Sequence, residues 1–122
     1  MTSEQLADKI ELTELANKLF MYCDARHWPR MLDEVFIETI WFDASSAGSG
    51  EPASMAARKV CEMWNEGFAG IDAVHHQAGH YVIDLTKNGA DISGYAMATH
   101  YKKTATKGNT RTFVGSYDLK AV

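Results

Sequence analysis

Apolar residues recur at helical spacing through the first 24 positions of the chain. Thr2, followed three residues later by Gln5, has the form of a capping box, which marks the start of a helix. The pattern predicts a helix from about residue 3 to residue 24. Its apolar positions are Leu6, Ile10, Leu12, Leu15, Ala16, Leu19, Phe20 and Cys23.

Two further helices and one strand are predicted before residue 70. Pro29 suits the first turn of a short helix, PRMLDEVF. The segment ETIWFDASS has the β-branched and aromatic content of a strand, and it runs into the loop SAGSGEP. The segment PASMAARKVCEMWNEGF then predicts a third helix, with Pro52 near its start and Gly67 near its end.

The second half of the chain changes to the pattern of strands. Three runs have this character: VHHQAGHYVIDL, DISGYAMATHYKKT and TRTFVGSYDLKAV. The segments between them, TKNGAD and ATKGNT, place Gly beside Asn, as hairpin turns often do. Helices followed by an antiparallel sheet predict an α+β fold with the helices on one face of a curved sheet.

The turn at Asn88-Gly89 sets the register of the first hairpin. A three-residue loop with Gly89 in the left-handed conformation pairs residues whose numbers sum to 176, so that His76 lies opposite His100 and His80 opposite Ala96. A two-residue Asn-Gly turn shifts the sum to 177, although a bulge at Gly79 would restore the first pairing. Both registers remain open from the sequence.

In the preferred register, three histidines stand on a face made of alanine and glycine. Small residues leave space above the sheet, and polar groups in such space are typical of a small-molecule pocket. Each histidine taken alone is explained equally well as exposed or as bonded to backbone. A metal site is not expected, because His76 and His80 are about 13 Å apart on one strand. His75 points to the opposite face.

Composition narrows the functional classes. The chain has 122 residues, enough for one domain, and a net charge of −4 without a basic cluster, so nucleic acid is not an expected partner. No signal peptide or membrane-spanning run is visible. Cys23 and Cys61 are isolated in apolar stretches, as reduced core thiols of a cytoplasmic protein would be.

Asp24 lies where the first helix is expected to end. The helix dipole disfavours a negative charge there, which suggests a tertiary partner, and a histidine would be the natural one. A solvated Asp that helps to end the helix is the simpler alternative. An Asp bonded to one imidazole nitrogen leaves the other as a base tuned near neutral pH.

Three N-terminal helices, CDARHW at the end of the first, HHQAG on a strand and ATHY further on resemble the SnoaL-like group. This group belongs to the nuclear transport factor 2-like superfamily, with scytalone dehydratase and ketosteroid isomerase. The resemblance covers nearly the whole chain as a single domain, residues 1–122. It implies a cone-shaped, barrel-like α+β fold of three helices on a curved, mainly antiparallel sheet. It also implies a pocket between these layers and a homodimer formed through the outer sheet face.

By motif, the resemblance makes Asp24, His76 and His100 the catalytic residues. It implies a lyase or isomerase, without cofactor or metal, acting on an apolar oxygenated small molecule. Asp24 would orient His76, His76 would act as general base or acid, and His100 would bind or protonate a substrate oxygen. Five residues are expected to contact substrate: His80, Trp41, Met63, Trp64 and Phe68. For the last four, plain core packing is the alternative explanation. The alternative is a non-catalytic ligand-binding or dimerisation module.

Three features depart from the family pattern. Cys23 stands where a tyrosine precedes the Asp of scytalone dehydratase, and FDASS lacks the tyrosine that holds a water there. The family's usual last strand would follow Val122, so we expect either a sheet one strand short or a chain that continues.

Overall fold

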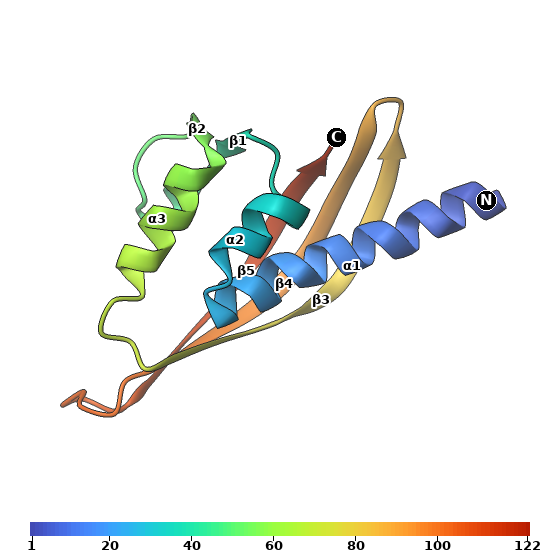
Figure 1. The fold of residues 1–122 in the computed structure, drawn as a ribbon. Helices are drawn as coiled ribbons and strands as arrows, with labels where there is room; N and C mark the ends of the chain where they lie inside the picture. The colour runs from blue at the N-terminus through green and yellow to red at the C-terminus, as the bar shows by residue number, and fades with distance from the viewer.

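The computed structural model describes residues 1–122, and its first half is mainly helical (Figure 1). The predicted first helix is confirmed as α1, Ser3–Ala25, with the capping box of Thr2 and Gln5 in place. The predicted second helix is a short helical segment that starts beside Pro29 and continues as a π-helical turn. The remaining elements of this half are α2 (Trp28–Arg30), η1 (Met31–Val35), β1 (Thr39–Phe42), η2 (Ser45–Ala47), β2 (Ala53–Ala56) and α3 (Ala57–Gly67).

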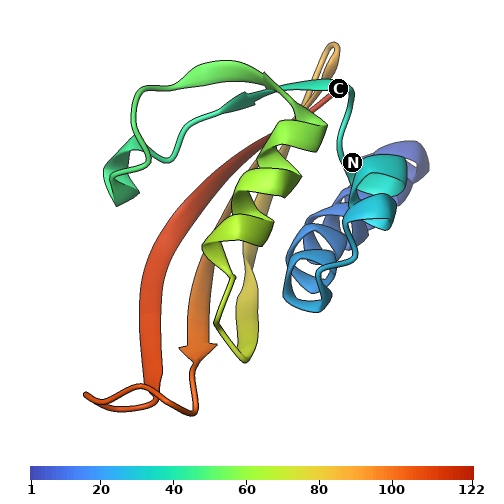
Figure 2. The same ribbon diagram turned by 60° about the vertical axis from the view of Figure 1, so that its left-hand side comes forward.

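The second half forms one antiparallel sheet of three strands in the order β3-β4-β5. Their bounds are β3, Ala73–Thr86, β4, Gly89–Tyr101, and β5, Thr110–Ala121. The helices lie on one side of this curved sheet, as Figures 1 and 2 show from two directions. The predicted α+β architecture is therefore confirmed.

The predicted start of the third helix was wrong. Residues 53–56 form β2, which pairs antiparallel with β1 in a separate two-stranded sheet, and the helix begins only at Ala57. The N–H of Ala57 donates to the carbonyl of Glu38 at 2.9 Å, so the strand pairing continues up to the first helical residue. Residues 53–56 are held in an extended conformation by this pairing, and the helix therefore starts after them.

The predicted hairpin register was also wrong. Thr86 pairs with Gly89, so the turn is the two residues Lys87 and Asn88, and Gly89 is a strand residue without a positive φ. Glycine is needed there because the carbonyl of Ala121 occupies the place of a β-carbon. A bulge follows at Gly79–Val82, where His80 adopts a φ of 55°. Beyond it, His76 pairs with Ala98.

The bulge exchanges the faces of β3. Before it, the even-numbered Val74 and His76 face the helices; after it, the odd-numbered Tyr81 and Ile83 do so, while Val82 is exposed. His80 lies exposed near Tyr95, with ring centroids 5.9 Å apart. The expectation that His80 shares a face with His76 and His100 was therefore wrong.

The core consists of two clusters. One joins the end of α1 to α3 through Tyr22, Cys23, Met31 and Cys61. The second lies under the first half of α1, around Ile83, Ala90 and Ile92. Burial raises the pKa of Cys23 to about 12, with the nearby Asp24 and Cys61 adding to the effect, so its thiol stays protonated at neutral pH.

A membrane-spanning helix needs more length and more apolar residues than any helix of this structure has.

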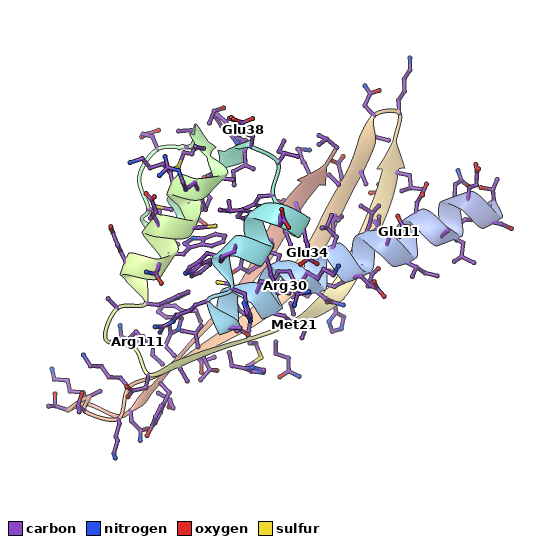
Figure 3. All side chains as sticks on the ribbon, in the orientation of Figure 1. Glu11, Met21, Arg30, Glu34, Glu38 and Arg111 are labelled. Atoms are coloured by element: carbon purple, nitrogen blue, oxygen red, sulfur yellow. The ribbon has the colours of Figure 1, made fainter.

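Glu34 connects η1 to α1 on the surface (Figure 3). Its carboxylate pairs with Arg30 at 2.7 Å and accepts a hydrogen bond from the Tyr22 hydroxyl at 2.9 Å. The hydrogen bonds from Arg30 and Tyr22 lower the pKa of Glu34 to about 2. The segment after α1 is therefore held against the helix that carries Asp24.

Gly94 of β4 is expected to resist substitution. A β-carbon there would lie 2.6 Å from Cδ1 of Tyr81, whose hydroxyl donates to Asn17 of α1 at 3.0 Å. We expect Gly94→Ala to lower the free energy of unfolding in urea by about 1–3 kcal/mol, as overpacking does. Gly115→Ala is the matched control, because nothing lies within 4 Å of its β-carbon position. Equal stability of the two variants would contradict the packing of Tyr81 on Gly94.

Candidate functional site

Asp24 and His76 form a two-point contact between α1 and β3. One carboxylate oxygen, Oδ1, lies 2.5 Å from Nδ1 of His76. The other, Oδ2, accepts a hydrogen bond from the backbone N–H of His76 at 2.8 Å. Because β3 is an edge strand, this N–H has no partner strand, and the carboxylate takes its place. The pairing of Asp24 with a histidine, suggested by its position on the helix, is present in the structure.

This contact fixes the tautomer of His76. A carboxylate only accepts hydrogen bonds, so Nδ1 of the neutral ring carries the proton and Nε2 carries the free lone pair. The side chains of His76 and Asp24 are 10% and 18% exposed, which shields their pairing from water. His76 is thus arranged as a base with an adjacent carboxylate that stabilises its protonated form.

His75 is the neighbour of His76 on the opposite face. Its ring is exposed, and its Nδ1 lies 3.9 Å from Oδ2 of Asp24, beyond hydrogen-bond distance. His75 therefore provides a control for His76, because it is the adjacent residue and makes no hydrogen bond with Asp24.

No three His, Cys, Asp or Glu side chains in the structure lie close enough together to hold a metal ion.

His100 lies on the same sheet face as His76. It is opposite Val74, while His76 is opposite Ala98, so the two histidines are diagonal neighbours on adjacent strands. Nδ1 of His100 is buried and has no hydrogen-bond partner. Burial lowers the pKa of His100, and the charge of a protonated His76 lowers it further. His100 is therefore neutral at neutral pH and keeps one unused polar atom.

Aromatic rings from separate elements surround the two histidines. Phe20 of α1 lies 5.5 Å from the ring of His76 and 5.1 Å from that of Tyr117. Phe113 of β5 meets His100 edge-on at 5.3 Å, yet it is 54% exposed. These rings were not predicted from the sequence. The alternation of side chains along β5 could have placed Phe113 and Tyr117 on one face.

Arg26 was also missed from the sequence. It caps α1 with a φ of 55°, two residues after Asp24. Its guanidinium donates to the carbonyls of Phe68 and Ile71 at 3.1 and 2.7 Å and lies 5.8 Å from the Phe68 ring. Arg26 thereby holds the end of α3 against the end of α1.

The residues of α3 and its end that were predicted to contact substrate lie in different places relative to His76 and His100. Phe68 lies 5.9 Å from His100, beside the site. Trp64 packs instead among Trp28, Phe36 and Phe42, in the core. Met63 is half-buried on α3.

Trp41 does not lie on the inner side of β1. It is 67% exposed, because alternate strand residues face opposite sides and its neighbour Phe42 takes the inner position against Trp64. The expectation that Trp41 walls a pocket was therefore wrong.

Two surface hollows lie away from the histidines. The larger is between the first half of α1 and the end of the sheet, where Leu12, Leu15 and Leu85 line it. The second adjoins it near Gln5 and Ile83. Neither of these two hollows includes His76 or His100.

The lowered pKa of His100 predicts a dependence of stability on pH. The unfolded chain binds a proton near pH 6.5, whereas the folded chain does so only at lower pH. The contribution of neutral His100 is therefore present above pH 6.5 and is lost as the pH falls through the folded pKa. We expect urea unfolding between pH 7 and 5 to show a steeper loss of stability in the wild type than in His100→Gln. Parallel curves would contradict this linkage.

Comparison with solved structures shows the same fold in three proteins. The Kfla4162 protein from Kribbella flavida superposes with a TM-score of 0.90 at 20% identity, covering 97% of this chain and 82% of that one. A "putative aromatic ring hydroxylase" from Novosphingobium aromaticivorans gives 0.78 at 20% identity, with coverages of 94% and 78%. A "putative scytalone dehydratase" from the same organism gives 0.73 at 16% identity, with coverages of 97% and 75%.

Family membership is shown by a match to a protein-family model and not by these distantly related structures. No functionally curated protein matches the chain. The model of the SnoaL-like domain matches residues 4–122, nearly the whole chain. The chain therefore belongs to the SnoaL-like domain family.

Proposed function

We propose that the protein is a small lyase or isomerase that moves a proton by means of the Asp24–His76 pair. The observation that carries the proposal is the two-point contact, 2.5 Å to Nδ1 and 2.8 Å from the backbone N–H. It fixes both the tautomer and the orientation of the ring. The free Nε2 is then the atom that meets the substrate.

In the proposed step, Nε2 of His76 takes a proton from a carbon next to a substrate carbonyl, and the electron pair of the broken C–H bond forms an enolate. In a dehydration, this electron pair then forms a carbon–carbon double bond as the C–O bond to the departing hydroxyl breaks. Asp24 stabilises the resulting imidazolium. The proton returns to another carbon of the same molecule in an isomerisation, or to a departing hydroxyl, which leaves as water, in a dehydration. Both outcomes balance without a cofactor.

His100 is assigned to substrate binding rather than to proton donation. Burial keeps its ring neutral, and a neutral imidazole is a weak acid but a good hydrogen-bond partner. Its unpartnered Nδ1 offers a contact to a substrate oxygen. Phe20, Phe68 and Phe113 supply apolar surface around the two histidines.

These surroundings favour an apolar, oxygenated small molecule with a ring. One of the structural neighbours is named as an aromatic ring hydroxylase and another as a scytalone dehydratase, which agrees with substrates of this kind.

A non-catalytic ligand-binding module is the second candidate. It is favoured by the packing of Phe20 against the ring of His76 and by the position of the two hollows away from it. A module of this kind would bind its ligand without needing the lone pair of Nε2.

Native mass spectrometry of the purified protein tests the proposal by identifying a retained small molecule. Incubation of that molecule with the protein should give a product of equal mass, or one lighter by a single water. His76→Ala should abolish conversion, while His75→Ala should retain it. Binding without conversion by the wild type would identify the module.

A further inference from the structure

Arg111 of β5 is the cross-strand neighbour of His100. The two residues are directly opposed in the register of β4 with β5, and opposed residues of an antiparallel pair share a face of the sheet. Arg111 lies at the end of the sheet where the loop after α3 also lies (Figure 3). Burial and the charge of His76 lower the pKa of His100 most, and the charge of Arg111 is close enough to lower it further. Arg111 therefore belongs to the surroundings of the site.

The guanidinium of Arg111 has no carboxylate or carbonyl partner within residues 1–122, unlike the other three arginines. Arg30 and Arg58 each pair with a glutamate four residues further on, and Arg26 donates to two backbone carbonyls. A permanent cation and a titratable imidazole thus stand side by side on one face. This arrangement disfavours protonation of His100 unless an anion lies with them.

Positive charge is concentrated at this end of the sheet. Residues 101–111 contain four of the 12 Lys and Arg of the chain and neither Asp nor Glu, although the whole chain has a net charge of −4. Asp72 adjoins this segment, and its carboxylate accepts the backbone N–H of Lys103 at 2.6 Å. A local excess of positive charge raises the concentration of anionic ligands nearby.

We propose that the substrate of the Asp24–His76 site carries a carboxylate, which Arg111 binds beside His100. A guanidinium is planar and can donate two parallel hydrogen bonds to the two oxygens of a carboxylate. Nδ1 of His100, which has no partner in the protein, can donate to the same carboxylate when it carries a proton. The inference deepens the proposed function and rests on it for the statement that this ligand is a substrate.

Phe113 places the rest of the ligand. It follows Arg111 by two residues on the same face of β5, about 6.6 Å further along the strand. Its ring meets that of His100 edge-on at 5.3 Å. A ring bound against Phe113 therefore has its carboxylate near Arg111, and the substrate class is a cyclic or aromatic carboxylic acid. The carboxylate is the binding group, and the carbonyl next to the reacting carbon is a separate group of the molecule.

Titration of the full chain with benzoate and benzamide, followed by NMR, tests the carboxylate site without a known substrate. The two probes have nearly the same shape, and only benzoate is charged. We expect benzoate to bind at millimolar concentrations and at least about tenfold more tightly than benzamide. Arg111→Gln should remove this preference. Arg111→Lys should retain part of it, because lysine keeps the charge and loses the planar fork.

Lys107→Gln is the matched control. It removes the same charge from the turn between β4 and β5 and not from the sheet face. Because a distant exposed charge is screened by salt, the preference for benzoate should stay within about twofold of the wild type. The pKa of His100 is the second readout. An adjacent anion stabilises the protonated ring, so benzoate should raise this pKa in the wild type and in Lys107→Gln.

Four results would overturn the inference: no binding of benzoate at millimolar concentrations, equal affinity for the two probes, equal weakening by Arg111→Gln and Lys107→Gln, or binding that leaves the pKa of His100 unchanged. Failure of the proposed function gives a different result. A retained carboxylic acid that binds through Arg111 and is not converted would contradict the enzyme and support the carboxylate site. Conversion of an uncharged molecule at the same rate by Arg111→Gln would contradict the carboxylate site and support the proton transfer by His76.

Discussion

Asp24→Asn is expected to leave the protein folded and to lower turnover by about 10²–10⁴-fold. The asparagine carbonyl can still accept the backbone N–H of His76, which Asp24 accepts at 2.8 Å. Its NH₂ group then faces Nδ1 of the ring. Because this group is a donor, Nδ1 must become an acceptor, and the ring proton moves to Nε2. The lone pair that would take a proton from the substrate is then lost.

The tautomer of His76 can be measured without a substrate. A long-range ¹⁵N–¹H correlation spectrum distinguishes a proton on Nδ1 from one on Nε2. We expect Nδ1–H in the wild type and Nε2–H in Asp24→Asn. His75→Ala is the control, because its ring nitrogen is 3.9 Å from Asp24 and makes no hydrogen bond with it.

Two results would contradict the assigned roles. Full turnover of an identified substrate by Asp24→Asn would show that the carboxylate does not orient the base. An Nε2–H ring in the wild type would show that the lone pair is directed at Asp24 rather than at a ligand. Unfolding of Asp24→Asn in urea, measured alongside, separates loss of orientation from loss of fold.

The first helix could be predicted because its signals are local. The capping box of Thr2 and Gln5 and the spacing of the apolar residues both act within one or two turns. The start of α3 could not, because residues 53–56 have no distinctive pattern of their own. They become a strand only by pairing with β1, which depends on the loop that brings the two together.

His76 and His100 were placed on one face although the register was wrong. The predicted sum of paired numbers was 176, and the pair of His76 with Ala98 gives 174. Both sums are even, and opposite residues share a face, so the error moved the partner by two residues and left the face unchanged. His80 was misplaced because it lies in the bulge, where the face alternation of β3 is reversed.

The surroundings of the histidines depend on packing between distant segments. Phe20 comes from α1, Phe113 from β5 and Arg26 from the cap of α1. The contact of Phe20 with His76 follows from the position of α1 along β3, and that of Phe113 with His100 follows from the register of β4 with β5. No local pattern specifies either of them. The helix-end position of Asp24 predicted a histidine partner, and the family resemblance named His76. Neither predicted that Phe20 packs against His76 or that Phe113 packs against His100.

Met31→Ala is expected to cause a large loss of stability, about 2–5 kcal/mol in the free energy of unfolding. Met31 is 0% exposed and packs between Tyr22 and Cys23 of α1 and Cys61 of α3. Truncation removes buried apolar surface and leaves a cavity between these helices.

Leu32→Ala is the matched control for this variant, because Leu32 is the next residue along η1 and is exposed. We expect it to cost less than about 0.5 kcal/mol, as most surface substitutions do. The measurement is urea unfolding of both variants followed by circular dichroism. Since Tyr22 and Cys23 directly precede Asp24, Met31→Ala should also weaken the hold on the Asp24–His76 pair, with broader His76 signals in the nitrogen spectrum. Equal losses in the two variants would show that the cluster around Met31 does not hold α1 to α3.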